Sequence, residues 1–251
     1  MAFLTVIVTL FGLAISPAIG AEQTPLKLVY ADYKPYSWEE HGEVVGLEID
    51  ILNEALGKRM GLQLSHRVLP WARAQLEVEL GHADAFVATL SEQRSEYADA
   101  SAEALTNWEV ALYFKRGDPR FAGITGVSDL APFNIGSMIG NAWVETNLSG
   151  MSVSYARNME QLPEMLMKGR IDVIPDSPLA MRRFLNEQRY KDKIVELPMP
   201  ELNKPMFLYL GKNSKFRQRL GEFDTILLQM KKDGSLQRIH DRYLSQGTEK
   251  L

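Results

Sequence analysis

The chain of 251 residues contains no cysteine. This absence excludes disulfide bonds, thiolate catalysis, zinc sites with cysteine ligands and lipid attachment through an N-terminal cysteine. The four histidines are scattered, and neither His-Glu-x-x-His spacing nor a Gly-x-Ser-x-Gly elbow occurs. Phosphate-binding loops and dinucleotide fingerprints are missing as well. The sequence therefore offers no complete catalytic set, and we expect no metal and no cofactor.

Clusters of positive charge are also missing. The formal net charge is -4, and no block of Lys or Arg stands out. Neither a nucleic-acid footprint nor a membrane-surface patch is therefore predicted. Hydrophobic residues make up 45% of the chain, which is enough for one large domain or two of ordinary size.

The first twenty residues carry no charged side chain and contain an apolar run over residues 3–15. Together with the small residues that follow, this run predicts a secretory signal peptide over residues 1–20, cleaved near Gly20–Ala21, and a periplasmic mature protein. Because no Lys or Arg precedes the apolar run, two alternatives stay open, a start further upstream and a retained membrane anchor. The run is short for a membrane span, which favours cleavage.

Strand-like and helix-like segments alternate twice along the chain. The first set predicts three strands separated by helices that start near residues 49 and 70, with the strands at 26–30, 62–68 and 84–89. The second set predicts strands at 133–137, 152–156 and 171–174 and helices at 142–148 and 159–168. Such alternation is typical of a parallel sheet with helices on its faces. We therefore predict an α/β fold with two lobes.

The helix-to-strand junctions of the two sets match. Leu80-Gly-His-Ala-Asp84 and Lys168-Gly-Arg-Ile-Asp172 both place glycine at the helix end and aspartate before the strand. Two lobes of one design explain this repeat economically, although so short a pattern can also recur by chance.

No third sheet is predicted after the second lobe, so the helical tail is expected to pack back on the first lobe. This makes the first lobe discontinuous, with residues 25–113 and 205–251, and leaves residues 114–204 for the second lobe. The chain would then cross between lobes near Tyr113–Phe114 and Lys204–Met206. Two crossing strands form a hinge, and the cleft between lobes is a preferred place for a ligand.

An apolar strand that starts at Asp84 ends in Thr89, Ser91 and Arg94. A guanidinium is planar and always charged, so Arg94 suits bidentate capture of a carboxylate. The hydroxyls of Thr89 and Ser91 can donate to the same anion. The alternative is a surface ion pair of Arg94 with one of three nearby acids, Glu92, Glu96 or Asp99.

In open parallel sheets, ligands lie beyond the carboxyl ends of the strands. The second lobe presents there Asp176 and the turn at residues 136–142, whose backbone N–H groups can hold an anion. An arginine and an aspartate at different ends of one cleft suit a zwitterion. For Asp176 the alternative is a helix cap through Ser177-Pro178.

Aromatic residues are candidates for the rest of the pocket. Tyr36 in the loop after the first strand and Trp71 at a helix start are the two that we expect to face the ligand, where a ring can stack on a cation. Tyr33, Trp38 and Trp143 are weaker candidates, since aromatic side chains are more often part of the core. Arg73 either adds positive charge to the pocket or pairs with Glu77.

Three segments in combination resemble the family-3 solute-binding proteins of bacterial ABC importers, the periplasmic polar amino-acid binders. These segments are residues 36–52, residues 89–101 and Gly169–Asp176, and the resemblance covers about residues 25–245. It implies a two-lobe periplasmic-binding-protein-like fold of type II that closes on its ligand. By resemblance, Arg94, supported by Thr89, binds the α-carboxylate and Asp176 binds the α-ammonium.

The sequence departs from the family pattern in three places. Gly140-Asn141-Ala142 stands where the family has Gly-Thr-Thr, which leaves backbone N–H groups and the Asn141 amide as carboxylate donors. The segment from Asp84 to Arg94 is shorter than in typical members. Leu69-Pro-Trp71-Ala-Arg73 resembles a less characterised branch of the family, which leaves the amino-acid specificity open.

We therefore expect a monomeric periplasmic protein that captures a small carboxylate-bearing solute, an amino acid or a related amine acid, and delivers it to a membrane ABC permease. No cofactor and no nucleic-acid partner are expected. One alternative is an enzyme on the same fold, a cyclohexadienyl-type dehydratase in which Arg94 holds a carboxylate and Glu48, Asp50 or Asp176 protonates the leaving hydroxyl. Another is a ligand-sensing module for a membrane receptor.

Overall fold

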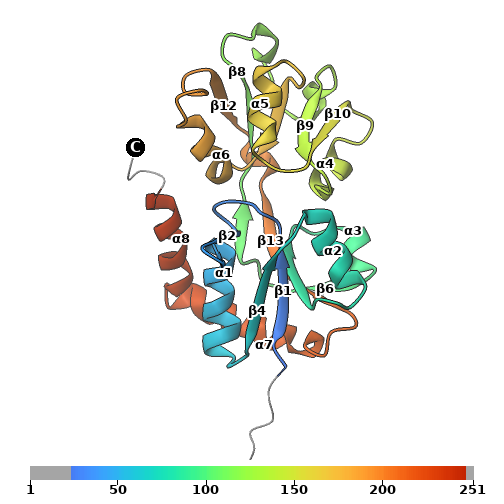
Figure 1. The fold of residues 1–251 in the computed structure, drawn as a ribbon, viewed down its shortest axis with the longest axis vertical. Coiled ribbons are helices and arrows are strands. Elements are labelled where there is room, and N and C mark those ends of the chain that lie inside the picture. Colours follow the sequence, from blue (N-terminus) through green and yellow to red (C-terminus); the bar gives the residue numbers. More distant parts are fainter. Residues whose placement is uncertain (1–23, 247–251) are drawn as a thin grey trace, which may run out of the picture.

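The structure is a computed structural model that describes residues 24–246 (Figure 1). The predicted signal peptide, residues 1–20, lies outside the described residues, as does the end of the chain after residue 246. Two sheets, each with its own helices, form two lobes that lie one above the other in Figure 1. The predicted two-lobe α/β architecture is confirmed.

The first lobe is built on a sheet with the strand order β4-β1-β5-β13-β6, and β7 also pairs with β13. Its strands are β1 (Leu26–Tyr30), β4 (Leu64–Val68), β5 (Ala85–Ala88), β6 (Ala98–Ala100), β7 (Thr106–Trp108) and β13 (Lys204–Gly211). β1 is parallel to β4 and β5, whereas β13 is antiparallel to β5, β6 and β7. Because β13 comes from the last third of the chain, the first lobe is discontinuous, as predicted.

Helices and a hairpin complete the first lobe. They are the hairpin β2 (Trp38–Glu40) and β3 (Glu43–Val45), α1 (Leu47–Leu52) with its continuation η1 (Asn53–Arg59), α2 (Trp71–Glu79), α3 (Glu92–Ser95), η5 (Arg217–Arg219), α7 (Leu220–Lys232) and α8 (Ser235–Gln246). η1 has the wider hydrogen bonding of a π-helix, so α1 and η1 form one continuous rod.

The second lobe has a sheet with the order β10-β9-β11-β8-β12, in which β10, β9 and β11 are parallel and β8 is antiparallel to both of its neighbours. Its elements are β8 (Ala111–Lys115), η2 (Pro119–Phe121), η3 (Val127–Leu130), β9 (Ile135–Met138), α4 (Ala142–Asn147), β10 (Val153–Ala156), α5 (Gln161–Met167), β11 (Val173–Asp176), α6 (Pro178–Leu185), β12 (Ile194–Pro198) and η4 (Pro200–Leu202).

The first crossing between lobes lies earlier than expected. The boundary predicted at residues 113/114 falls inside β8, whose strand pairs entirely within the second sheet. The residues before it, β7, pair with the start of β13, so these two segments form the two-stranded connection. At this connection Val110 N–H donates to the Asn203 side-chain oxygen over 2.8 Å. We therefore place the division of the chain at residues 109–110 and near residue 203.

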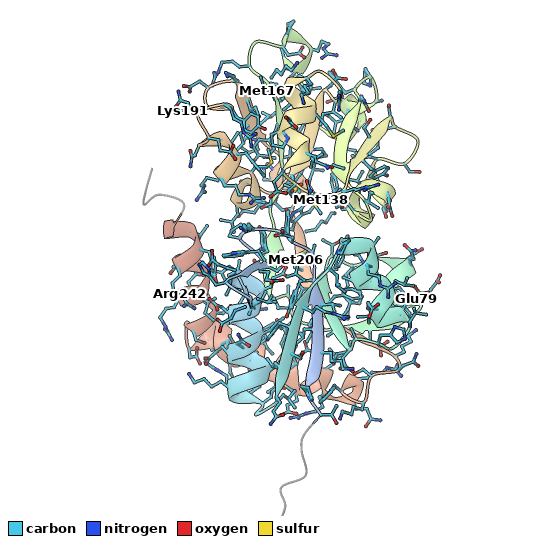
Figure 2. The ribbon with its side chains drawn as sticks, viewed as in Figure 1. Glu79, Met138, Met167, Lys191, Met206 and Arg242 are labelled. Atoms are coloured by element: carbon cyan, nitrogen blue, oxygen red, sulfur yellow. The ribbon has the colours of Figure 1, made fainter. Side chains whose placement is uncertain are left out.

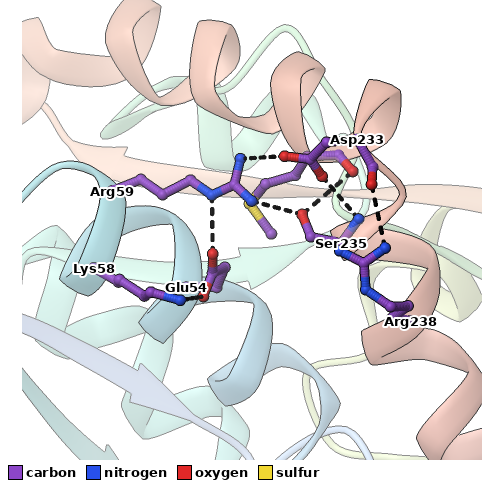
Figure 3. Close-up of polar contacts among 7 residues, drawn as sticks. Glu54, Lys58, Arg59, Asp233, Ser235 and Arg238 are labelled. Carbon is purple, nitrogen blue, oxygen red and sulfur yellow. Dashed lines mark hydrogen bonds and ion pairs between the residues drawn. The ribbon is translucent and has the colours of Figure 1, made fainter.

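The tail packs back on the first lobe. Phe223, Leu227 and Met230 of α7 are buried in the core. Figure 3 shows how the loop between α7 and α8 is fixed to η1, because the Arg59 guanidinium donates to Asp233 and to Ser235, each over 2.8 Å. These contacts join two segments that lie far apart in the sequence.

The repeated helix-to-strand junction has the same geometry in both lobes. Gly81 and Gly169 both have positive φ, of 74° and 71°, which glycine adopts without a steric penalty. The residues after them, His82 and Arg170, donate to carbonyls in the last helical turn over 2.8 and 2.9 Å, as in a Schellman motif. Each lobe therefore uses the same device to turn from a helix into the next strand.

The aspartates of this junction act alike as well. Asp84 accepts a hydrogen bond from the Lys27 amide, and Asp172 accepts one from the Asn134 amide, each over 2.9 Å. Both acceptors lie at the start of a strand and bind the start of the neighbouring strand. The repeat in the sequence thus encodes strand pairing in both sheets.

Candidate ligand-binding site

A pocket with a cavity volume of about 110 Å³ lies between the lobes. The first lobe and its hinge strand contribute residues that follow the strand ends, and the second lobe contributes residues after β9 and β11. Met138 and Met206, which both line the pocket, lie where the two lobes meet (Figure 2). Its polar and aromatic lining includes Tyr30, Tyr33, Glu48, Trp71, Thr89, Arg94, Trp108, Asn141, Trp143 and Asp176.

Arg94 on α3 is only 3% exposed and lines this pocket. Its Nε donates to the Gln75 side-chain oxygen over 3.0 Å, and its Nη1 donates to the Thr89 carbonyl over 2.9 Å. The guanidinium carbon lies 5.5 Å from the centre of the Trp71 ring. Two sides of the guanidinium are thus fixed by the first lobe.

No carboxylate of residues 24–246 forms an ion pair with Arg94. The alternative of a surface pair with a neighbouring acid does not occur, and Asp99 pairs with Arg217 instead. Burial lowers the pKa of the Arg94 guanidinium, which nevertheless stays charged at neutral pH. A buried cation is costly unless an anion pairs with it, so this pocket is suited to an anionic group of a ligand.

Gln75 connects Arg94 to the second lobe. While its side-chain oxygen accepts from Arg94, its amide nitrogen lies 3.4 Å from the carbonyl oxygen of Gly140. Gly140 has a φ of 81°, and a β-carbon there would lie 3.2 Å from the Trp71 ring. The turn after β9 therefore approaches α2 closely, and the lobes touch at this edge of the pocket.

Asp176 lies at the end of β11, is 3% exposed and lines the pocket from the second lobe. It accepts hydrogen bonds from the Tyr33 hydroxyl and, over 2.7 Å, from the Ser177 amide. Burial raises the pKa of the Asp176 carboxyl to about 6, against the lowering effect of these two donors. The bond to Ser177 satisfies one backbone donor at the start of α6, while the rest of the carboxylate is available to the pocket.

Tyr36 does not line the pocket, contrary to the prediction. Its ring stacks on that of Tyr33, with centroids 5.1 Å apart, and its hydroxyl bonds to the Ser177 hydroxyl over 2.8 Å. Tyr33 occupies the pocket side of this pair and accepts a hydrogen bond from Trp108 over 2.9 Å. The loop thus presents its first tyrosine to the ligand and buries its second between the lobes.

Ser91 is the other predicted residue outside the lining. Leu90 is exposed, and Ser91 is the residue before α3, where its amide donates to the Tyr209 hydroxyl over 3.2 Å. Thr89, Arg94, Trp71 and Asn141 do line the pocket. The Asn141 side-chain oxygen accepts from Val144 at the start of α4, over 3.4 Å.

Trp143, Arg73 and Ala142 were also named from the sequence as candidates for the pocket. Trp143, a weaker candidate, lines the pocket, whereas Arg73 pairs with Glu77 on α2, the alternative left open from the sequence. The side chain of Ala142 is outside the described part of the structure. Tyr30 and Trp108 also line the pocket, and neither was predicted to do so, because each is the last residue of a strand and looks like part of the core.

Residues 27–246 match the family described as bacterial extracellular solute-binding proteins, family 3. The chain belongs to this family. The match confirms the resemblance noted from the sequence. Among curated proteins, no sequence matches this solute-binding protein.

Solved structures share the fold of this solute-binding protein. The substrate-binding protein of an amino acid ABC transporter has a TM-score of 0.71 at 22% identity, over 88% of this chain and 99% of that one. A histidine kinase sensor domain with similarity to periplasmic binding proteins has a TM-score of 0.75 at 16% identity, over 88% and 96% of the two chains. The ancestral amino acid-binding protein AncCDT-1, a precursor of cyclohexadienyl dehydratase, has a TM-score of 0.69 at 19% identity, over 87% and 95%. At these identities the likeness establishes the two-lobe fold alone.

Within residues 24–246 of this solute-binding protein, no helix is long and apolar enough to cross a membrane. The same residues contain no group of three or more His, Cys, Asp or Glu side chains placed to hold a metal ion.

Glu48 is a pocket residue of this solute-binding protein that the sequence analysis did not assign to ligand binding. It lies in the first turn of α1, is 5% exposed and lines the pocket. Within the described chain its carboxyl group has neither a hydrogen bond nor an ion pair, and burial raises its pKa to about 8. A signal was present, because Glu48, Ile51, Leu52 and Ala55 follow helical spacing on one buried face.

The titration of Glu48 predicts how the stability of the ligand-free protein depends on pH. Because the folded-state pKa of about 8 lies above the ordinary 4.5, the stabilising contribution of the protonated group is complete below pH 4.5 and is lost as pH rises through 8. The loss is expected to be about 3 to 5 kcal/mol for a shift of this size. Glu48→Gln should therefore become more stable relative to wild type as pH rises over this window, measured by urea unfolding.

Glu40→Gln, on the exposed hairpin β2–β3, is the matched control and should follow wild type at every pH. Parallel curves for wild type and Glu48→Gln across the window would contradict the assignment of this titration to Glu48.

Proposed function

We propose that this protein captures a small solute carrying a carboxylate and an amino group, an amino acid or a related amine acid, between its two lobes. The observation that carries the proposal is Arg94, a buried guanidinium in the pocket without a carboxylate partner among residues 24–246. A ligand carboxylate supplies the missing negative charge and suits the fork of guanidinium donors. The hydroxyl of Thr89 and the side-chain amide of Asn141 are further donors along the lining.

Asp176 is the proposed partner of the amino group. It comes from the lobe opposite Arg94, and its hydrogen bonds to Tyr33 and Ser177 leave acceptor capacity toward the pocket. A zwitterion would thus contact one lobe through its carboxylate and the other through its ammonium. Trp71, Trp108 and Trp143 add apolar walls that exclude water from both contacts.

Binding is proposed to favour a closed arrangement of the lobes. Contacts that exist only when the lobes meet are the bonds of Tyr33 to Asp176, of Tyr36 to Ser177 and of Gln75 to Gly140. A ligand that bridges Arg94 and Asp176 contacts both lobes only when they are closed. It therefore stabilises the closed state relative to an open one. Closure is then a shift of population that requires no chemistry.

We further propose that the protein works in the periplasm and delivers its ligand to a membrane ABC importer, as a monomer and without a cofactor. The family description and the structural likeness to an amino acid ABC transporter component support this role. The likeness to a histidine kinase sensor domain keeps a sensory partner as the alternative. Co-purification with a tagged permease or with a receptor would separate the two.

A dehydratase is the second candidate, favoured by one observation. Glu48 is an acid that burial keeps protonated near neutral pH, and it lines the same pocket as Arg94. The protein shares its fold with AncCDT-1, a precursor of cyclohexadienyl dehydratase. Mass spectrometry of the ligand after incubation decides between the functions, since a dehydratase releases water and a new acid, whereas a binding protein returns its ligand unchanged.

Calorimetry against a panel of amino acids tests the proposed function. The protein should first be unfolded and refolded to remove any ligand that is carried through purification. We expect saturable binding of at least one amino acid, because its carboxylate and ammonium pair with Arg94 and Asp176. The methyl ester and the N-acetyl derivative of that amino acid should both fail to bind, since each lacks one of the two charges. Equal binding of either derivative would contradict the assignment.

A further inference from the structure

A second cavity lies beside the ligand pocket, at the connection between the lobes. Helix α4 of the second lobe forms one side of it with Trp143 and Asn147, and the start of β13 forms another with Lys204. Its volume of about 340 Å³ is about three times the 110 Å³ of the ligand pocket. Leu90, which also lines it, is 62% exposed, so the cavity opens to solvent.

The two cavities share a boundary. Thr89 and Trp143 line both of them. Trp143 packs edge-on against Trp108, with ring centroids 5.5 Å apart, and Trp108 is the partner of Lys204 in the register of β7 and β13. A group that leaves the ligand pocket between Thr89 and Trp143 therefore enters the cavity that Lys204 lines.

The indole N–H of Trp143 at this boundary has no acceptor among the residues that the structure describes. The nitrogen is buried, and the whole residue is only 4% exposed. An indole nitrogen can only donate, and buried donors are nearly always paired. Because the ring lies between the two cavities, a ligand in them is the expected source of the missing acceptor.

The second cavity also offers an unmatched positive charge. Lys204 is half-buried, and none of the ion pairs within residues 24–246 involves it. The described lining of this cavity contains no acid that could pair with the ammonium group. An anionic group in the cavity would therefore find a charge-assisted donor.

The charges of the two cavities, taken together, favour a ligand with two negative groups. At neutral pH the described lining presents two cations, Arg94 and Lys204, and one anion, Asp176. Glu48 adds no charge, because burial raises its pKa to about 8. A simple zwitterion uses Arg94 and Asp176 once each and leaves Lys204 unmatched, whereas a second carboxylate on the ligand completes the balance.

We infer that the second cavity binds an extension of the ligand, so that the preferred solutes are amine acids whose side chain continues through a carbonyl group to a terminal carboxylate. Trp143 donates to the carbonyl oxygen, and Lys204 pairs with the terminal carboxylate. The inference rests on the proposed function, since it takes Arg94 and Asp176 as the partners of the α-carboxylate and the amino group. It adds to that function a second subsite and the two residues that set its preference.

Three probes separate the filling of the second cavity from the pairing of charges. Glutamine has the α-groups and a side-chain carbonyl, γ-glutamylethylamide adds two carbons, and γ-glutamylglycine replaces the last methyl group by a carboxylate. In titration calorimetry, wild type should bind γ-glutamylethylamide severalfold more tightly than glutamine, because the added carbons become buried. It should bind γ-glutamylglycine at least about tenfold more tightly than γ-glutamylethylamide, the low end for a hydrogen bond to a charged group.

Lys204→Met tests the charged end of the subsite. This variant should bind γ-glutamylglycine and γ-glutamylethylamide with nearly equal affinity, because the partner of the terminal carboxylate is gone. Lys191→Met is the matched control and should keep the wild-type ratio of the two affinities. Lys191 is exposed, lines neither cavity, and lies far from Met206 at the meeting of the lobes (Figure 2).

Trp143→Phe tests the donor at the boundary, since it keeps an aromatic ring and removes the N–H. The variant should weaken the binding of γ-glutamylethylamide about fivefold more than that of norleucine, which has no side-chain carbonyl to accept a hydrogen bond. Equal weakening of the two ligands would overturn the assignment of this donor.

Two results would overturn the subsite itself. One is a wild-type protein that binds γ-glutamylglycine no more tightly than γ-glutamylethylamide, a comparison that does not depend on the folding of any variant. The other is a Lys204→Met protein that keeps the wild-type ratio of these affinities. In each case, an amino acid that still binds and still needs both of its α-charges would leave the proposed function standing. A failure of the proposed function looks different, because then no amino acid binds, with or without an extension.

Discussion

Replacing Arg94 with methionine is expected to abolish solute binding and to leave the ligand-free protein at least as stable as wild type. In the complex, the ligand carboxylate would lie buried without its cation, and removing one partner of such a pair costs about 3 to 5 kcal/mol. That cost corresponds to a loss of roughly a hundredfold to several thousandfold in affinity. Titration calorimetry with the best ligand of wild type measures it directly.

The stability part of this prediction follows from the environment of Arg94. Without ligand the guanidinium is buried among Trp71, Gln75 and Thr89, and it has no negative partner among the described residues. Replacing a buried charge by an apolar side chain of similar length is often neutral or stabilising. The Thr89 carbonyl keeps the Tyr209 hydroxyl as a donor over 3.2 Å, so the substitution orphans only the Gln75 oxygen.

Arg73→Met is the matched control for the arginine substitution. Arg73 lies outside the pocket and pairs with Glu77, which also accepts from Arg67 over 2.9 Å. This variant should bind ligand as wild type does and should lose a little stability. Retained affinity in Arg94→Met would contradict the carboxylate assignment, and a clear fall in its unfolding temperature without ligand would show that Arg94 serves the fold instead.

Much of the fold could be predicted because its signals are local. Apolar spacing marked the main helices and the parallel strands, and the glycine and aspartate of each junction marked the turn from α2 to β5 and from α5 to β11. The short strands β6 and β7 gave no such signal. Each has three residues, too few for a recognisable period, and each exists because β13 from the distant end of the chain pairs with it. The boundary between the lobes was predicted inside β8 for a similar reason. The composition of an apolar strand does not show which of the two sheets it pairs with, and β8 pairs within the second sheet.

The residues of the candidate site likewise fall into those that could be predicted from local signals and those that could not. Thr89, Arg94 and Asp176 could be placed in one pocket because they follow strand ends in two similar lobes, and strand ends meet at one edge of a sheet. The choice between Tyr33 and Tyr36 could not be made, because it depends on how the loop folds over Gly46. Glu48 looks like a solvated acid at a helix start until its neighbours at helical spacing are considered. Site residues whose positions depend on long-range contacts are therefore the ones that could not be predicted from the sequence.

Asp176→Asn is expected to weaken the binding of a neutral amino acid by roughly a hundredfold, since a charge-assisted bond to the ammonium contributes about 3 kcal/mol at most. The change should also remove a pH dependence. Because burial raises the pKa of Asp176 to about 6, wild-type affinity should fall as the pH is lowered through this value and the carboxylate becomes protonated. The fall approaches about tenfold for each further pH unit. Titrations with a neutral amino acid keep any charge on the ligand side chain out of the measurement and so report on Asp176.

The control for this variant is Asp172→Asn. Asp172 precedes the same strand and pairs with Arg120 and the Asn134 amide, outside the pocket, so its loss should lower stability while the pH dependence of binding stays. Wild-type affinity that is equal at about pH 5 and about pH 7 would exclude Asp176 as the partner of the ammonium.

The Asp176 carboxyl group should also affect the stability of the ligand-free protein. As pH rises, its deprotonation should raise the affinity for the ligand but lower this stability. Its folded-state pKa is raised above 3.8, so its stabilising contribution is complete below pH 3.8 and is lost as the pH rises through about 6. Near neutral pH the empty site therefore holds a buried carboxylate and a buried guanidinium that both destabilise the fold, and a zwitterion relieves both at once. Stability is best measured in a Glu48→Gln background, because the titration of Glu48 also lowers ligand-free stability above pH 4.5. Opposite slopes of affinity and ligand-free stability between about pH 4 and pH 7 in that background, both flattened when Asp176→Asn is added, would establish that one group causes them.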